Sequence, residues 1–304
     1  MTTLLFRAGA SRTGGIADAC GAANRCWPLR EPQVIRLFLA VLLFAPPSAA
    51  TAIVTRHDVD DSEYRVASSE FPALVDMPKS GHGVLVAPQW VITAAHTLPR
   101  RGKLRKVSIN GKSRRVERVV IHEGYRTLPQ ELIQQAAATG ESGRMVSFVS
   151  SSDDIALVKL ARPVTDVAPA AIHEDGVQPG EIVRIIGKGA TGNGAAGYRL
   201  GASSRTELRR AYNEISSVDD RWFCYRFDGP SSALPLEGAL GNGDSGGPAL
   251  VQVEDQWRLS GLASWKVIDG HMLTASYGRY DQVTCNVRLG HYADWIRGVI
   301  SGQP

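Results

Sequence analysis

The stretch GVLVAPQWVITAAH, residues 83–96, contains two short apolar runs separated by a turn. The runs at 83–87 and 90–93 are rich in β-branched and aromatic residues, and Pro88-Gln89 lies between them. Runs of this length and composition, bounded by turn residues, are typical of paired β-strands. His96 follows the second run closely. The stretch therefore predicts a titratable ring at the end of a buried strand.

The same pattern continues through most of the chain. Short apolar, β-branched runs recur with Gly, Pro, Asn or Ser between them, at residues 116–121, 155–160, 182–186, 208–212, 222–227, 249–253, 257–263 and 285–289. Regular short strands with turn residues between them favour an all-β barrel or sandwich over an α/β fold.

Two segments depart from the strand pattern. Residues 129–138 (PQELIQQAAA) begin with Pro and are followed by Gly140, which predicts a short helix in an inserted loop. Residues 292–300 (YADWIRGVI) carry apolar positions on one side and predict a closing amphipathic helix. Residues 165–180, which include two prolines, are the expected crossing between two halves of the chain.

The first 52 residues have the layout of a secretory signal segment. A nine-residue apolar run (LFLAVLLFA, 37–45) follows Arg30 and Arg36 and precedes the small-residue site Ala50-Thr51-Ala52. The run is too short to span a membrane as a helix, and a buried strand or helix start is the alternative. We expect a leader over 1–52, a first β-barrel over 53–168, and a second barrel with the closing helix over 169–304.

The formal net charge is +4, and this segment holds five of the 34 Lys and Arg residues and two of the 30 acidic ones. The remaining chain is close to neutral, which gives no reason to expect nucleic acid as a partner. Beyond residue 52 the cysteines are Cys224 and Cys285. In an exported protein two cysteines form either one bridge or two buried thiols.

The hexapeptide GDSGGP, residues 243–248, is the strongest functional signal in the chain. A nucleophilic Ser245 needs a tight turn that exposes its hydroxyl, and the flanking glycines permit such a backbone. The N–H groups of Gly243 and Ser245 would then form an oxyanion hole. The alternative is a β-turn with an incidental Ser.

A serine hydroxyl needs a base, and that base needs a carboxylate to orient it. His96 is the candidate base. Asp153 and Asp154 directly precede the apolar run IAL at residues 155–157. A slip of one residue would exchange the two acids, and we favour Asp154 because it adjoins that run.

The order His, Asp, Ser within TAAH, DIAL and GDSGGP resembles the trypsin/chymotrypsin family of serine peptidases, including its secreted bacterial members. The resemblance extends from about residue 53 to 300. It implies two six-stranded antiparallel β-barrels with a C-terminal helix, and a peptide-bond hydrolase that uses an acyl-enzyme. It also implies that Ser264 supports the catalytic Asp and that Trp265 walls the substrate cleft. The whole implied substrate-binding set is Ala239, Leu240, Asn242, Ser264, Trp265, Lys266 and Thr284.

Several positions depart from the family pattern. Thr97 follows His96 and Gly241 stands where cysteines are usual, so two common bridges are missing, whereas Cys224 and Cys285 align with neighbouring strands and are expected to pair. Ala239 stands where a trypsin-like enzyme has Asp, so we expect no preference for Arg or Lys. Lys266 and Thr284 replace glycines and would narrow the pocket, which predicts small or medium-sized apolar residues at the cleavage position. A blocked pocket is the opposite reading.

We expect no metal and no cofactor, because the chain has no HExxH motif, paired CxxC motif or EF-hand loop. The expected partner is a polypeptide substrate, with no nucleic acid, no stable membrane anchor and a monomeric state. Two other functions stay open: a peptidase-fold binding module that no longer cleaves, and an esterase that uses the same three residues.

Overall fold

The computed structural model describes residues 53–100, 102–190, 192–198, 207–267 and 276–302. The predicted leader, residues 1–52, lies outside the described residues. Among those described, no helix is long and apolar enough to cross a membrane.

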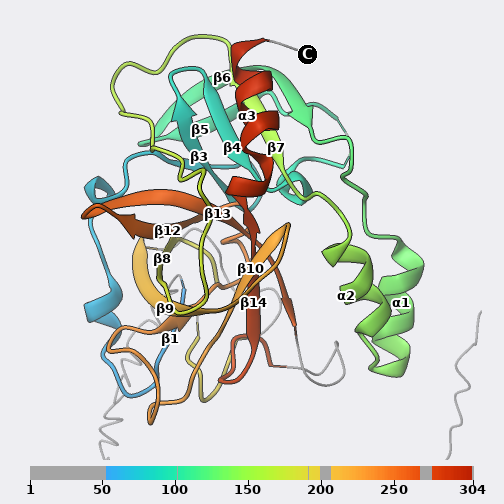
Figure 1. Ribbon diagram of the computed structural model, residues 1–304, viewed down its shortest axis with the longest axis vertical. Helices are drawn as coiled ribbons and strands as arrows, with labels where there is room; N and C mark the ends of the chain where they lie inside the picture. Colours follow the sequence, from blue (N-terminus) through green and yellow to red (C-terminus); the bar gives the residue numbers. More distant parts are fainter. Residues whose placement is uncertain (1–52, 101, 191, 199–206, 268–275, 303–304) are drawn as a thin grey trace, which may run out of the picture. The chain divides into compact units, whose positions relative to one another are not determined.

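Six antiparallel strands close a first barrel (Figure 1). In their order around the barrel they are β2 (Leu74–Asp76), β3 (His82–Ala87), β4 (Trp90–Thr93), β7 (Ala156–Leu160), β6 (Lys112–Ile121) and β5 (Lys106–Ile109). Strand β4 is buried along its whole length, as its uninterrupted apolar run predicts. Its register pairs Thr93 with Ala156 on β7, so the ends of these two strands meet.

A second barrel follows in the sequence. Its strands, in order around the barrel, are β10 (Trp222–Arg226), β14 (Val283–Arg288), β13 (Gln256–Val267), β12 (Pro248–Val253), β8 (Ile182–Gly187) and β9 (Arg209–Val218). All neighbours are antiparallel. The two closed six-stranded barrels confirm the predicted fold class.

The start of the described chain packs on the second barrel. Strand β1 (Val54–Thr55) pairs with β11 (Gly238–Ala239), and Ile53 and Tyr64 are fully buried in the core of that barrel. A segment that precedes the first barrel in sequence therefore borders the stretch that leads to Ser245.

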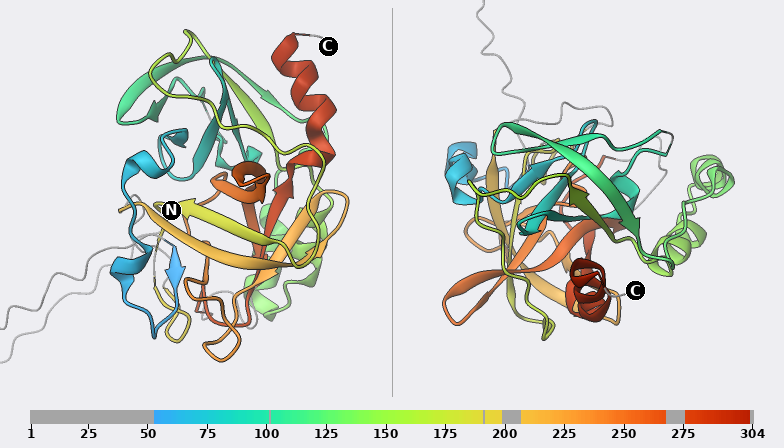
Figure 2. Two further views of the ribbon diagram at one scale, coloured as in Figure 1. Left: turned by 60° about the vertical axis from the view of Figure 1, so that its left-hand side comes forward. Right: turned by 90° about the horizontal axis from the view of Figure 1, so that it is seen from above.

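Three α-helices accompany the barrels. Helix α1 (Gln130–Thr139) begins after Pro129 and ends at Gly140, whose φ of 78° is left-handed, as the sequence predicts. It pairs with α2 (Gly143–Ser150), which the sequence analysis did not predict, and the two project from the barrels (Figures 1 and 2). Helix α3 (Ala293–Ser301) lies beside the first barrel (Figure 2). Its Ile296 is buried in the same hydrophobic core as residues of that barrel.

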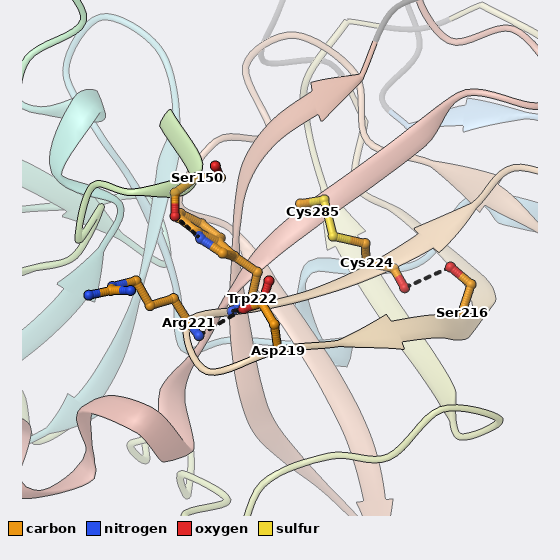
Figure 3. Close-up of a disulfide and its surroundings, with 7 residues drawn as sticks. All are labelled: Ser150, Ser216, Asp219, Arg221, Trp222, Cys224 and Cys285. Atoms are coloured by element: carbon orange, nitrogen blue, oxygen red, sulfur yellow. Dashed lines mark hydrogen bonds between the residues drawn. A yellow bond between two sulfur atoms is a disulfide. The ribbon is translucent and has the colours of Figure 1, made fainter. Parts of the chain in front are cut away.

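The predicted disulfide is present and joins Cys224 on β10 to Cys285 on β14, directly opposite in register (Figure 3). On the same strand, Trp222 Nε1 donates a hydrogen bond of 2.8 Å to the carbonyl of Ser150 at the end of α2. This hydrogen bond joins the pair of helices α1 and α2, the helical insertion, to the second barrel.

Candidate active site

The carboxylate of Asp154 lies against His96. Asp154 Oδ2 is 2.6 Å from His96 Nδ1, and the His96 backbone N–H donates to Asp154 Oδ1 at 2.9 Å. His96 follows β4 and Asp154 precedes β7, so the pairing of these strands brings the two residues together. Burial opposes protonation of His96, but the charge and hydrogen bond of Asp154 outweigh it and raise the pKa of the imidazole above its ordinary value.

The neighbouring acid, Asp153, faces a different environment. Its Oδ1 accepts hydrogen bonds from Arg221 Nε at 2.7 Å and from the Tyr292 hydroxyl at 2.8 Å. Asp154 instead accepts a third hydrogen bond, from the Ser264 hydroxyl on β13, at 2.5 Å. Of the two acids that the sequence left in competition, Asp154 is the one beside the imidazole.

The turn around Ser245 is fixed by backbone geometry. Gly243 has a φ of 96° and Gly246 a φ of 73°, both in the left-handed region that favours glycine. A Cβ on Gly246 would come within 2.3 Å of the His82 carbonyl oxygen. The His82 N–H donates to the Ser245 carbonyl at 2.7 Å, and the Gly246 N–H donates to Ala263 at 2.7 Å. The turn is therefore held between β3 and β13, with Ser245 partly exposed.

Two N–H groups of this turn have no acceptor among the described residues: those of Gly243 and Ser245. The intervening Asp244 is fully buried, and its carboxylate accepts from Gly189 N–H at 2.6 Å and Gly241 N–H at 2.8 Å. Burial raises the pKa of Asp244, against the effects of these donors and of the nearby His82 and Lys266. These two bonds of Asp244 anchor the turn.

The expected substrate-binding residues differ in their burial and contacts. Ala239 and Leu240 are buried, whereas Asn242 is exposed. Lys266 Nζ donates hydrogen bonds to the Leu240 carbonyl and, at 2.9 Å, to the Tyr198 hydroxyl, which in turn donates to Asn242 Oδ1 at 2.9 Å. Thr284 lies opposite Lys266 on β14.

Sequence reasoning did not identify Tyr198. It directly follows the glycine-rich loop TGNGAAG at 191–197, which we interpret as a surface loop, and no motif marks it. Tyr198 is a neighbour of Lys266 only through the fold, because 68 residues separate them.

A cavity of about 260 Å³ lies beside His96. It is lined by His96, Asp154, Ser264 and Trp265, and by residues of the first barrel and the insertion: Arg100, Tyr125, Arg126, Leu128, Val149 and Ser152. The insertion thus forms a wall of the site, a role that its sequence did not predict. Across the part of the chain that the structure describes, no group of three or more His, Cys, Asp or Glu residues is placed to hold a metal ion.

The chain is similar to known proteins in sequence and in fold. A family model described as "Trypsin" matches residues 61–296. Vitamin K-dependent protein C from Rattus norvegicus is 25% identical over 246 residues, which cover 72% of this chain and 45% of the relative. The corresponding protein from Mus musculus is 26% identical over 245 residues, with the same coverage. The chain therefore spans less than half the length of these relatives.

Among solved structures, neuropsin, a serine protease expressed in the limbic system of mouse brain, is similar in fold. The TM-score is 0.56 at 18% sequence identity, and the match covers 78% of this chain and 98% of neuropsin.

Proposed function

Because the chain belongs to the trypsin family, which is a family of serine peptidases, we propose that it is a serine endopeptidase with Ser245 as nucleophile. His96 acts as general base and Asp154 orients it. The observation that carries the proposal is the arrangement around Asp154, in which one carboxylate accepts from His96 twice and from Ser264.

The reaction proceeds in two halves. His96 Nε2 takes the proton of the Ser245 hydroxyl while the Ser245 oxygen attacks the scissile carbonyl carbon. The oxyanion that forms accepts hydrogen bonds from the free N–H groups of Gly243 and Ser245. His96 then gives its proton to the leaving amine, and an acyl-enzyme remains. Water, deprotonated by His96, attacks the acyl carbon, and the collapse of this second tetrahedral intermediate returns the proton to Ser245.

Asp154 contributes by holding one tautomer of His96. Its Oδ2 accepts the proton on Nδ1, so that Nε2 carries the lone pair that faces the nucleophile. No hydrogen bond joins the His96 ring to the Ser245 hydroxyl among the described residues. In unliganded enzymes this bond is commonly long and shortens when substrate binds.

The proposed cleavage preference is not that of trypsin. Ala239 offers no carboxylate to a substrate Arg or Lys. The Lys266 ammonium, which bonds to the carbonyl of the next residue, Leu240, would repel such a cationic side chain. Export from the cytoplasm is part of the proposal, since a disulfide is typical of oxidising compartments. The monomeric state and the lack of nucleic-acid and membrane partners stay predictions.

A binding module without turnover is the second candidate. The observation that favours it is the Lys266 side chain, which stands where the family pattern has glycine and donates a hydrogen bond to the Leu240 carbonyl, five residues before Ser245.

A fluorophosphonate probe separates these two functions, because it reacts with an activated serine without needing a particular substrate side chain. We expect rapid labelling of the purified protein and none of Ser245→Ala. Ser216→Ala, which changes a serine on β9 whose side chain bonds the Cys224 carbonyl, is the control and should label like the unmodified protein. Failure of the unmodified protein to label would contradict the proposed mechanism and favour the binding module.

A further inference from the structure

Three side chains form a row across the inner face of the second barrel. In the register of the sheet, Tyr225 on β10 lies opposite Thr284 on β14, and Thr284 lies opposite Lys266 on β13. Directly opposed residues of antiparallel strands point to the same face. Tyr225 belongs to the core of this barrel, so the row faces inward. The next row, Cys224, Cys285 and Trp265, faces the other way.

The Lys266 ammonium in this row is bound only to neutral groups among the described residues. Its hydrogen bonds go to the Leu240 carbonyl and the Tyr198 hydroxyl, and it lies 5.2 Å from the centre of the Tyr198 ring. No described carboxylate lies within ion-pair distance of it. An ammonium has three N–H donors, so one of them has no acceptor among the residues that the structure describes.

The Lys266 side chain is partly buried. Burial lowers the pKa of Lys266 to about 8, although the charge of Asp244 acts in the opposite direction. The cost of removing a charge from water is the term that usually cancels the gain of a buried ion pair. In this protein, folding has already removed water from the ammonium. Binding of an anion there therefore costs less desolvation than it would at the surface.

The ammonium contacts residues that lie close in sequence to the candidate nucleophile. Leu240, which accepts from Lys266, is five residues before Ser245, and Asn242 accepts from Tyr198, which itself binds Lys266. On the other side, Lys266 is two residues beyond Ser264, which bonds to Asp154. The ammonium thus contacts the segment that leads to Ser245, and Lys266 follows in sequence the two residues, Ser264 and Trp265, that line the cavity beside His96.

We propose that Lys266 makes this peptidase select an acidic side chain, Asp or Glu, on the substrate residue whose carbonyl Ser245 attacks. The inference rests on the proposed function and names its substrate class. A substrate carboxylate would accept a hydrogen bond from the remaining donor of Lys266 and form an ion pair with the ammonium. An apolar side chain would cover the remaining donor of the ammonium without accepting from it, and a basic side chain would be repelled. The prediction from sequence, small or medium-sized apolar residues, considered only the size of Lys266 and not the position of its charge.

The test uses peptides that are identical except at the cleavage position, which carries Glu, Asp, Gln, Ala or Lys. Gln matches Glu in shape and lacks only the charge. For the purified protein we expect kcat/KM to be at least about tenfold higher for Glu or Asp than for Gln, as for a close, desolvated charge pair. Lys266→Met should bring the Glu-to-Gln ratio close to one, whereas Lys266→Arg, which keeps the charge, should retain an acidic preference. Lys106→Met, which changes an exposed lysine on β5 of the first barrel, is the matched control and should leave the ratio unchanged.

Labelling by the fluorophosphonate probe is measured on the same samples. A protein that labels and cleaves but prefers Ala, Lys or Gln would overturn the acidic preference and leave the proposed function intact. A protein that neither labels nor cleaves any peptide would overturn both. The ratio in the unmodified protein decides the matter even if a Lys266 variant fails to fold.

Discussion

Ser264 on the second barrel donates a hydrogen bond of 2.5 Å to Asp154 on the first. The same Asp154 oxygen lies 2.6 Å from His96 Nδ1. The carboxylate that orients the imidazole is therefore itself positioned from the opposite barrel, and the geometry of the site depends on how the two barrels pack.

Removing this contact should impair turnover. A hydrogen bond to a charged group contributes about 1.5–3 kcal/mol, so we expect Ser264→Ala to lower kcat roughly tenfold or more. Ser260→Ala on the same strand is the control, because the Ser260 hydroxyl bonds to the Arg258 carbonyl and has no hydrogen bond to Asp154 or His96. Unchanged kcat in Ser264→Ala, measured by steady-state kinetics, would show that Asp154 holds its position without this bond.

The activity should fall on the acid side as His96 becomes protonated. His96 must be neutral to accept a proton, and Asp154 raises its pKa above the ordinary 6.5 by favouring the charged form. The acid limb of the kcat/KM profile should therefore lie above pH 6.5. Asp154→Asn removes the negative charge, so the limb should move to lower pH and kcat should drop by about 10⁴, as in the family's well-known example. A limb below pH 6 in the unmodified protein would argue against the Asp154–His96 pairing.

For acidic substrates an alkaline limb should appear as well. Lys266 must be charged to bind a carboxylate, and its pKa of about 8 means that this charge is lost as the pH rises through about 8. The groups that face the ammonium are the Tyr198 hydroxyl and the Leu240 carbonyl, and the nearby Asp244 raises this pKa. Since kcat/KM reports the free enzyme, the limb should belong to Lys266 itself.

The matched variant for this limb is Lys266→Arg. An arginine side chain stays protonated throughout this range, so cleavage of the Glu peptide should persist at higher pH. The same alkaline limb in Lys266→Arg would assign it to another group.

The disulfide should stabilise the second barrel. Cys224 and Cys285 are 61 residues apart in sequence, and closing such a loop typically contributes about 2–4 kcal/mol to the free energy of unfolding. We expect the double variant Cys224→Ala/Cys285→Ala to unfold at lower temperature in calorimetry. Mass spectrometry of a non-reduced digest should recover the two cysteine peptides as one linked species. Two separate peptides would contradict the bond.

Much of the fold could be predicted from the sequence because its signals are local. The apolar runs at 90–93 and 249–253 became β4 and β12, and Pro129 and Gly140 bounded α1. The sequence predicts only residues 116–121 of β6 and does not predict β5, although Asn110-Gly111 between them has positive φ at both residues, the turn that this dipeptide favours in hairpins. Helix α2, with the sequence GRMVSFVS, lacks a side-chain cap and contains β-branched residues, so nothing local distinguished it from a strand.

The candidate triad could be predicted for the same reason, since each of its residues adjoins a short sequence motif. The contacts of Lys266 could not be predicted in this way. Its contacts with Tyr198 and Leu240 span 68 and 26 residues, and the direction of its ammonium follows from strand register in the second barrel. The sequence placed Lys266 near the pocket, and the tertiary structure supplied the environment of its charge.

The central claim is that Ser245 is the nucleophile of a peptidase, and a peptide-library digest tests it most directly. Purified protein and Ser245→Ala are each incubated with a proteome-derived library, and new peptide ends are identified by mass spectrometry. The account predicts many new ends from the unmodified protein, enriched in Asp or Glu at the cleavage position, and none from Ser245→Ala. Equal numbers of new ends from both proteins, or none from either, would contradict it.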